Sequence, residues 1–504
     1  MRVLISILLF NQLIFSANIL SNCILDPNTR TFERFQFTFP EQIESEHFIV
    51  HFTTSNADSQ FVNEQWLNLQ CNFGYAQSVI ELAEYALAIF MEADWEMMPP
   101  DCDEGITDEE SPNHCNNFGG NALYDIYLAN DAVGLVAPEN PYPVEPYIGG
   151  FTSFMQVTPL GNDHTFVPDW SVHVIAHELH HAIQIRYGTS VSGEPGNYAY
   201  NGWLYEQTST YMENVIFPAS YHFLVMMGNC NITSPLTYPE ISIDSSVDIY
   251  QYRSALWQKF LVEAYGDSTI NRLIWEGFGL ETATGNPVNI FPIYESALQT
   301  VTDGVTTLGD AYEDYALWRY FTGSRSRPGE FFMQASSYCT ANLLAIEETS
   351  TTFPSEKGGA RLVKLLPYET NLVLASSAYD NLLVQHISFS EEDEILMSSI
   401  EVNGEESFFQ LNNPAGDNHA LLITSEYTAE PGEEIEFTLS NTVPFIEGDI
   451  TGDSMVNIQD IIVQINIILH QIDPTDYQWL AADLDENNVV DVLDVILLVN
   501  LILE

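Results

Sequence analysis

The chain contains few basic residues. Of its 504 residues only 13 are Lys or Arg, against 71 Asp or Glu, and the formal net charge at pH 7 is −58. Binding of nucleic acids or anionic membrane surfaces requires basic patches, so this composition excludes both as ordinary partners. The acidic surplus instead favours solubility and the binding of divalent cations.

Long apolar runs are also scarce. One run, Val3 to Phe15, follows Met1 and Arg2, and this pattern is typical of a signal peptide, which we expect to occupy residues 1–22. Beyond it, no segment provides the ~20 apolar residues that a membrane-spanning helix needs. The sequence therefore predicts a secreted protein, either extracellular or held at a cell surface by docking.

Cysteine is rare as well, with six residues, and none has the CxxC spacing of a zinc knuckle. In an exported chain these cysteines permit disulfide bonds. Cys102 and Cys115 flank the polar segment 103–114. We expect these two to form a disulfide.

The chain does contain an HExxH motif at residues 177–181. Apolar residues recur around it at helical spacing, which predicts a half-buried helix. His177 and His181, four residues apart, lie one above the other on one helical face, close enough to share a single Zn²⁺. Glu178 follows the first histidine, where its carboxylate can act as general base on a water that the metal activates.

A catalytic zinc site needs a third protein ligand and leaves the fourth position to water. A second helix-like segment, 202–213, follows a loop rich in Gly and Pro that can turn the chain back. Glu206 in this segment is the predicted third ligand. Glu213, two turns further on the same face, is the alternative ligand or a partner that orients a histidine. Tyr250 and Tyr252 are candidate donors to an oxyanion in the transition state.

His177-Glu178-x-x-His181, followed about 25 residues later by Trp203-x-x-Glu206, resembles the glutamate-liganded zincins, the thermolysin-like group of zinc metallopeptidases. The resemblance implies the two histidines and Glu206 as zinc ligands, and Glu178 as general base and proton shuttle. It also implies one catalytic zinc and no organic cofactor. The expected activity is that of a secreted endopeptidase acting on proteins or peptides.

Two other functions stay open at this point. The chain could be a non-catalytic extracellular scaffold or surface protein with a degenerate zincin domain, or a zinc hydrolase of substrates other than peptides. The intact set of His177, Glu178 and His181 favours catalysis over the scaffold.

Two copies of one acidic pattern occur about 34 residues apart near the C-terminus. Each places oxygen-bearing side chains at loop positions 1, 3, 5, 9 and 12 and a backbone carbonyl at position 7, which is the ligand pattern of a calcium loop. The predicted ligands of the first loop are Asp449, Thr451, Asp453, the carbonyl of Met455, Asn457 and Asp460. Those of the second loop are Asp483, Asp485, Asn487, the carbonyl of Val489, Asp491 and Asp494.

An apolar helix is expected after each loop, at 461–469 and 495–503, and the duplicated unit resembles a type I dockerin. The resemblance implies two structural Ca²⁺ ions and a cohesin-like protein partner. In dockerins this partner contacts loop positions 10 and 11, which are here Ile458, Gln459, Val492 and Leu493. The chain departs from the usual pattern at position 6, where Ser454 and Asn488 replace the preferred Gly, and in lacking basic residues in these helices.

The whole chain is therefore predicted to be a modular α+β protein. A zincin-like domain is expected at 23–350, with strands at 46–52 and 124–128 and helices in 250–322. Residues 149–157 are the predicted edge strand along which a peptide substrate aligns. An antiparallel β-sandwich is expected at 360–443, where short apolar runs alternate with turn residues. A small helical, calcium-binding domain is expected at 446–504.

Overall fold

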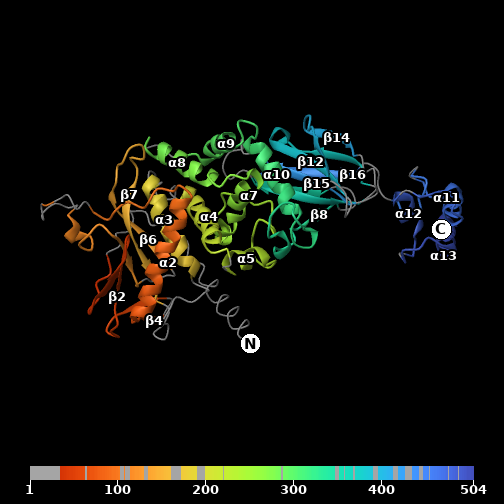
Figure 1. Ribbon diagram of the computed structural model, residues 1–504. Coiled ribbons are helices and arrows are strands. Elements are labelled where there is room, and N and C mark those ends of the chain that lie inside the picture. The colour runs from red at the N-terminus through yellow and green to blue at the C-terminus, as the bar shows by residue number, and fades with distance from the viewer. Residues whose placement is uncertain are drawn as a thin grey trace. The chain divides into compact units, whose positions relative to one another are not determined.

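The computed structural model (Figure 1) places most of the chain. It describes residues 34–62, 65–102, 107, 114–129, 134–159, 172–189, 199–218, 221–284, 288–346, 351–356, 358–366, 369–389, 395–411, 418–425, 434–441, 446–452, 455–474, 476–485 and 487–503. The predicted signal peptide 1–22 and the predicted calcium ligand Asp453 lie outside these residues. None of the described helices has the length and apolar character needed to cross a membrane.

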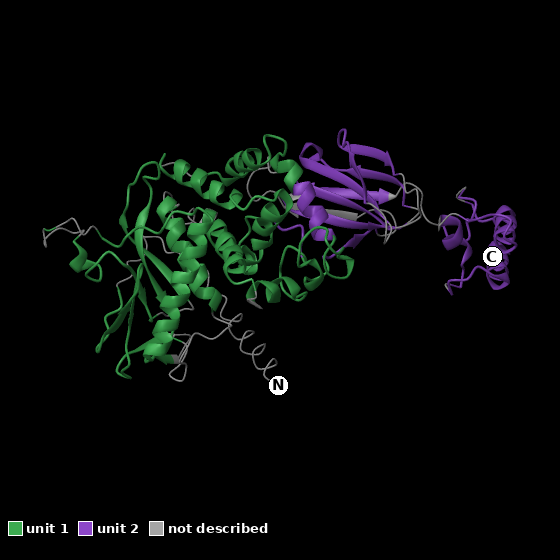
Figure 2. Ribbon diagram, in the orientation of Figure 1, with its two compact units in different colours: residues 1–237, 243–311, 321–340 green, residues 238–242, 312–320, 341–504 purple. Residues whose placement is uncertain are grey.

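The chain divides into two compact units (Figure 2). The first comprises residues 1–237, 243–311 and 321–340, and the second comprises 238–242, 312–320 and 341–504. Both contain sheets and helices, so the predicted mixture of α and β structure is confirmed.

A five-stranded sheet forms one side of the first unit. Its strands are, in spatial order, β1 (Glu41–Glu44), β2 (Phe48–Phe52), β5 (Tyr124–Tyr127), β7 (Phe151–Val157) and β6 (Gly134–Pro141). The three central strands are parallel, and the two outer strands run antiparallel to their neighbours. The strands predicted at 46–52 and 124–128 are therefore present as β2 and β5.

The predicted edge strand at 149–157 is wrong in its position. Its residues form β7, which lies between β5 and β6, and β6 is the edge strand instead. Six consecutive residues of β7 are buried, as expected for a strand covered on both faces. Burial on both faces removes the polar and apolar alternation that would distinguish an edge strand in the sequence.

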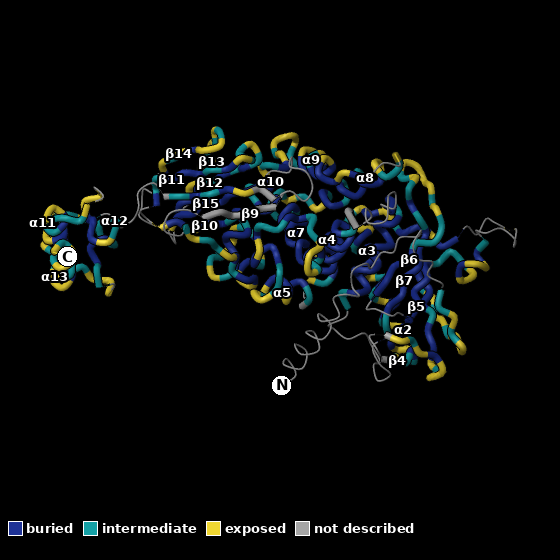
Figure 3. Tube along the Cα trace, turned by 180° about the vertical axis from the view of Figure 1, so that it is seen from behind, coloured by how far each residue is buried: buried dark blue, intermediate teal, exposed yellow. Residues whose placement is uncertain are grey.

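Helices pack against this sheet and against each other. Figure 1 shows α2 (Phe73–Glu92) and α3 (Val172–Tyr187) beside the strands, and α4 (Ala199–Ile216) packs on α3. The predicted helix around 177–181 is present, but it is not half-buried. All of its residues except Val172, His173 and Arg186 are buried (Figure 3), because α2, α4, α8 (Ile270–Thr282) and the sheet surround it.

The rest of the first unit is mainly helical, as predicted for 250–322. It contains α5 (Tyr221–Gly228), α6 (Tyr250–Arg253), α7 (Ala255–Tyr265), α8, α9 (Ile290–Val301) and the start of α10 (Leu308–Tyr320). The last turn of α7 ends at Gly266, whose φ of 68° is the left-handed conformation that glycine adopts without strain. The predicted disulfide Cys102–Cys115 is confirmed, and a second joins Cys230 to Cys339.

Arg34 holds together three carboxylates of the first unit. Its guanidinium lies 2.8 Å from Asp101 Oδ2 and 2.7 Å from Glu139 Oε2, and it also pairs with Asp125. Asp101 and Asp125 have fully buried side chains, and that of Arg34 is only 9% exposed. These carboxylates come from β5, β6 and a loop, so one arginine joins three separate parts of the chain.

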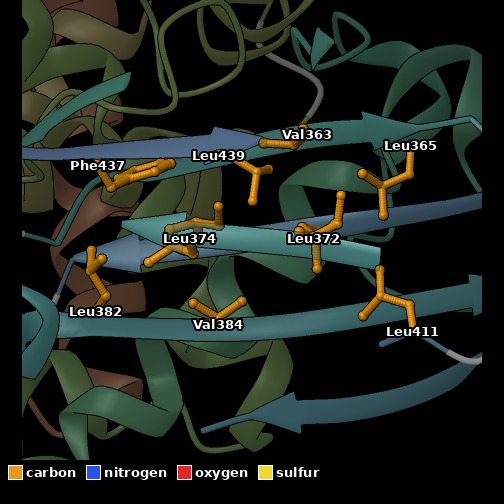
Figure 4. Packing of buried hydrophobic residues seen from close by; sticks show 11 residues of the cluster. Val363, Leu365, Leu372, Leu374, Leu382, Val384, Leu411, Phe437 and Leu439 are labelled. Carbon is orange, nitrogen blue, oxygen red and sulfur yellow. The ribbon is translucent and has the colours of Figure 1, made fainter. Parts of the chain in front are cut away.

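Two sheets of the second unit share one core. One has the order β13 (Leu396–Ile400), β12 (Leu382–Phe389), β15 (Asn418–Ser425), β10 (Ala360–Leu365) and β8 (Leu344–Ala345). The other has the order β14 (Glu406–Gln410), β11 (Asn371–Ala375), β16 (Glu434–Asn441) and β9 (Thr351–Glu356). Figure 4 shows alternate apolar residues of both sheets packed together, as in a β-sandwich.

The predicted sandwich is thus present, with two differences. It includes β8 and β9, which precede the expected start at residue 360, and β8 pairs with β10 in parallel whereas all other pairings in the two sheets are antiparallel. The stretch 350–359 is therefore not the predicted break between domains, because it contributes β9 to the sheet that contains β16.

Three helices form the C-terminal end of the chain: α11 (Ile458–Ile468), α12 (Asp476–Ala482) and α13 (Val492–Leu503). Their core contains Ile450, Ile467 and Leu498. The first and third helices are the predicted ones, and each begins three residues earlier than expected. Asn457 and Asp460 form a capping box at the start of α11, so the last positions of the acidic loop are also the first turn of the helix.

Two buried histidines meet inside the sandwich, His386 on β12 and His419 on β15. Nε2 of His419 is 2.7 Å from the carbonyl oxygen of Leu366, which can only accept, so this nitrogen donates. Nδ1 of His419 is then the acceptor for Nε2–H of His386, at 3.2 Å. Burial, with a contribution from the facing His419, lowers the pKa of His386 to about 4.

We expect the sandwich to lose stability in mild acid because of this pair. The unfolded chain binds a proton at His386 with an ordinary pKa near 6.5, whereas the folded chain does not, so the free energy of unfolding falls as the pH drops from about 6.5 to about 4. The expected loss is about 2 kcal/mol. Urea unfolding across this range measures it. His386→Gln retains an N–H donor and does not titrate, and an equal pH dependence in this variant contradicts the assignment.

Candidate metal centre

Three side chains from two helices converge inside the first unit. His177 and His181 lie one helical turn apart on α3, and Glu206 faces them from α4. Oε2 of Glu206 is 3.0 Å from Nε2 of His177 and 3.4 Å from Nε2 of His181. All three residues are buried, and their candidate ligand atoms lie within 4.8 Å of one another. The structure therefore brings together the three predicted zinc ligands.

The ring of His181 is oriented by Gln184. The amide nitrogen of Gln184 donates to the carbonyl of Tyr205 at 3.1 Å, which turns its oxygen, Oε1, toward His181 Nδ1 at 2.7 Å. Since this oxygen only accepts, Nδ1 of His181 carries the hydrogen and Nε2 keeps its lone pair. Nε2 is buried, and among the described residues its nearest polar partner is Oε2 of Glu206, at 3.4 Å. Its lone pair points into the cluster.

The ring of His177 is oriented by Glu213. Oε1 of Glu213 lies 2.7 Å from Nδ1 of His177 and accepts its hydrogen. This leaves Nε2 of His177 with its lone pair on the side of Glu206. Of the two roles predicted for Glu213, alternative ligand or orienting partner, the structure places it in the second.

The set of atoms that results suits a cation. Two imidazole lone pairs and one carboxylate oxygen approach one point in a buried place, where they repel one another unless a positive charge lies between them. Burial opposes ionisation of Glu206, but the positive charge and the hydrogen bonds that the facing His181 and His177 provide when protonated lower the pKa of this carboxyl to about 2. Burial lowers the pKa of His181 and so favours its neutral form, whose Nε2 offers a lone pair to a cation. Two neutral imidazoles and one carboxylate are a donor set that Zn²⁺ accepts.

Glu178 lies beside these ligands in an apolar place. Its side chain is buried, and Oε2 has no hydrogen-bond partner among the described residues. Burial raises the pKa of Glu178 to about 8. A carboxyl whose pKa lies near neutrality can both take up and release a proton. This is the property that the predicted general base requires.

Gly134, the first residue of the edge strand β6, lies directly against Glu178. A Cβ atom at position 134 would be 2.4 Å from Oε1 of Glu178 and 2.6 Å from its Cγ. Both distances are far below van der Waals contact. Only glycine therefore leaves room for the carboxylate where it lies.

The two tyrosines predicted as oxyanion donors differ in their placement. The ring of Tyr252 stacks on that of His177, with centroids 5.9 Å apart and planes 24° apart. Tyr252 is therefore at the site. Tyr250 is 1% exposed and belongs to the hydrophobic core.

Several residues of this site were not predicted from the sequence. Gln184, three residues after His181, could have been found from helical spacing, because i and i+3 share a face. Ser209, whose Oγ lies 3.1 Å from Nδ1 of His181, stands three residues after Glu206 and carries the same signal. Gly134 comes from a distant part of the chain, and His222 lies nine residues after Glu213 on the next helix. No local pattern indicates either of them.

The second acidic loop folds around its first and last carboxylates. Asp494 accepts hydrogen bonds from the backbone N–H of Leu484 and Asp485, and Asp483 accepts from Asn487. Oxygen atoms of Asp483, Asp485 and Asp494 lie within 4.8 Å of one another. These three predicted calcium ligands therefore converge, in a loop already bent by their own hydrogen bonds.

At position 6 of the second calcium loop, asparagine takes the conformation for which glycine is usually preferred. Asn488 has a φ of 64°, the left-handed conformation that asparagine tolerates better than most residues. Its backbone N–H donates to Asp483 Oδ2 at 2.9 Å. The equivalent Ser454 lies outside the described residues.

The first loop has the same arrangement in the part that the structure describes. Asp460 accepts from the backbone of Thr451 and Asn457, each at 2.8 Å, and Asp449 accepts from Gly452 at 2.9 Å. The side chains of Met455 and Val489 are exposed in their respective loops, which leaves the backbone carbonyl as the ligand at position 7.

Comparison with known proteins assigns the end of the chain. The model of the Dockerin type I domain matches residues 447–503. Residues 447–503 form a dockerin type I domain. Dockerin domains bind calcium and dock on cohesin partners, and this dockerin indicates extracellular docking at a cell surface, as in cellulosome-like systems.

A second match covers the metal-binding candidates. Residues 166–292, which include α3 and α4, match DUF6055, a family of unknown function. A search of curated proteins finds no match to the chain. The dockerin is therefore assigned by family, whereas the function of the site on α3 and α4 has to be argued from its own chemistry.

Gly134→Ala should displace the carboxylate of Glu178 without loosening the metal ligands. A shift of about 1 Å at a catalytic group can lower turnover roughly 100-fold. If Glu178 is the general base, we expect a kcat loss of this order with metal content unchanged. Steady-state kinetics with metal analysis measures both. Gly277→Ala is the matched control, because its Cβ would meet Ile293 at 2.6 Å, away from the site. Equal activity losses in the two variants would contradict a specific role for Gly134.

Asp483→Ala should remove one calcium ion from the dockerin and leave the first unit unchanged. The carboxylate is the first ligand of its loop, so we expect one bound Ca²⁺ per chain instead of two and a lower thermal stability of the dockerin. Calorimetric titration with calcium and metal analysis for zinc test this. Loss of zinc in this variant contradicts the separation of the two sites.

Proposed function

We propose that the chain is a secreted zinc-dependent endopeptidase that a calcium-loaded dockerin attaches to a cohesin partner. The observation that carries the enzymatic part is the convergence of two imidazole Nε2 atoms and Glu206 Oε2 beside the buried carboxylate of Glu178. His177, His181 and Glu206 would hold the ion. A fourth position would be left for water or substrate.

Zinc in this place would polarise a carbonyl group and lower the pKa of water. Glu178 would take a proton from the attacking water onto its carboxylate and later donate it to the leaving amine nitrogen. Its raised pKa favours the protonated form that donates to the amine, and a cation held beside it would favour the ionised form that accepts the proton. Tyr252, stacked on His177, is the candidate donor to the developing oxyanion.

The edge strand β6 suits an extended peptide. As the last strand of the sheet it has one side unpaired in the sheet, and a peptide can bind such an edge by main-chain hydrogen bonds. The strand begins at Gly134, beside Glu178. Pro138 and Pro141 lack an N–H, and alternate residues of 134–137 direct theirs to β7, so the open side of the strand offers the N–H groups of the other residues before the first proline. A substrate paired there would bring its backbone to the general base.

The dockerin supplies the second part of the proposal. Loop positions 10 and 11, where the resemblance places the partner contact, are exposed: Ile458 is 67% exposed, Val492 is 64% and Leu493 is 51%. Large apolar side chains exposed together mark a protein interface. We infer that these residues contact the cohesin partner, and that the missing basic residues make this contact more apolar than in the usual dockerin pattern.

Substituting Glu178 separates catalysis from metal binding. Glu178→Gln removes the proton acceptor but no ligand, so we expect one zinc per chain to remain while kcat for protein substrates falls by roughly 10²- to 10⁴-fold. Glu206→Ala should lose the zinc as well. Full proteolysis by Glu178→Gln, or by the chain after zinc removal, would sink the proposal. Zinc binding without cleavage of any peptide in a varied set favours the scaffold or the non-peptide hydrolase instead.

A further inference from the structure

A second group of side chains lies next to the candidate zinc ligands. It consists of His173 on α3, Glu213 on α4 and His222 on α5, and candidate ligand atoms of these three residues lie within 4.8 Å of one another. Glu213 connects the two groups, since Oε1 lies 2.7 Å from Nδ1 of His177 and Oε2 lies 2.5 Å from Nδ1 of His222. The two oxygens of one carboxylate are thus divided between two histidines.

The ring geometry argues against a second metal ion at this place. The rings of His173 and His222 are stacked, with centroids 4.1 Å apart and planes only 14° apart. The lone pair of an imidazole nitrogen lies in the plane of its ring, so one ion cannot lie close to both planes. Hydrogen bonding to Glu213 and stacking on His173 account for the position of His222 without an ion.

The position of Glu213 makes a second partner necessary. Its side chain is 2% exposed, and an oxygen atom of a buried carboxylate without a partner costs free energy. His222 fills this role for Oε2, leaving Oε1 directed at His177. Without it, the carboxylate could turn toward any other donor or toward water, and the orientation of His177 would be less strictly defined.

His222 is itself held firmly. It belongs to the short helix α5, which ends two residues before Cys230, the partner of Cys339 in a disulfide. The backbone N–H of Cys339 also donates to the carbonyl of Met227 at 2.7 Å, and Lys259 lies over the ring of Phe223 at 5.8 Å. These contacts fix α5, so His222 is a rigid support rather than a mobile surface residue.

We propose that His222 is a positioning residue of the metal centre. Its hydrogen bond to Oε2 of Glu213 fixes the orientation of this carboxylate. Oε1 of Glu213 then accepts from Nδ1 of His177, and the Nε2 lone pair of His177 is directed at the ion. The proposal rests on the zinc site of the proposed function. A third helix, α5, then takes part in orienting a metal ligand. This helix lies outside both the HExxH motif and the segment with Glu206. Partners of this kind typically change metal affinity 10- to 100-fold.

Zinc affinity of the full chain, measured by competition with a chromogenic chelator, tests this role. His222→Leu should raise the zinc dissociation constant roughly 10- to 100-fold. His222→Asn should restore most of the affinity, because an asparagine amide N–H can take the place of Nδ1–H. The absorption spectrum of the Co²⁺-substituted chain should change in His222→Leu and return in His222→Asn.

The chain offers a matched control in another histidine and glutamate pair. Nδ1 of His47 lies 2.8 Å from Oε2 of Glu84, far from the metal ligands in the sequence and partly exposed. His47→Leu should leave zinc affinity and the Co²⁺ spectrum unchanged. Glu213→Gln covers the case in which His222→Leu fails to fold, because its amide keeps the shape of the side chain and removes one acceptor oxygen; it should also weaken zinc binding.

The outcomes distinguish this inference from the proposed function. If the unmodified chain binds no zinc, the proposed function fails and this inference fails with it. If the unmodified chain binds zinc and cleaves peptides while folded His222→Leu and Glu213→Gln have the same zinc affinity, only the positioning role is overturned. A second tightly bound zinc that is lost in His173→Leu would also overturn it, in favour of a second metal site.

Discussion

Three donor groups of the first unit converge on one point, where a cation would be favoured. His177 and His181 direct Nε2 toward Oε2 of Glu206, and all three residues are buried. The surrounding structure fixes each partner: α3 is packed between the sheet and other helices, Gln184 sets the ring of His181, and Glu213 sets that of His177. Helix packing and the buried hydrogen bonds together preform the site.

The chain offers two different sets of metal-donor atoms in separate places. The candidate zinc ligands are buried and include imidazole nitrogen, whereas the dockerin loops offer oxygen atoms and surround them with backbone N–H donors. Zinc prefers the first set and calcium the second. The large acidic surplus of the chain is compatible with both, because each site draws on carboxylates held by specific hydrogen bonds rather than on net charge alone.

The sequence predicts those features of the sites that depend on residue spacing within one helix or one loop. Helical periodicity places His177, His181 and Glu206 on facing helices, and the loop pattern locates both calcium loops. It does not place the edge strand correctly, because the order of strands depends on pairing between distant segments, and Pro138 and Pro141 are the local sign that β6 lies at an edge. It also misses the seven-residue helix α12. Gly134 reaches the site from a segment far away in the sequence, and His222, only nine residues after Glu213, reaches it from the next helix. Neither contact follows a helical or strand spacing that the sequence would reveal.

The buried cluster around Arg34 ties the start of the described residues to the sheet of the first unit. Its guanidinium compensates Asp101, Asp125 and Glu139, and removing one partner of such a buried pair costs about 3–5 kcal/mol. Cleavage of the chain that detached Arg34 would leave buried negative charges unbalanced within this sheet. The integrity of the sheet therefore requires that Arg34 stay covalently attached to it.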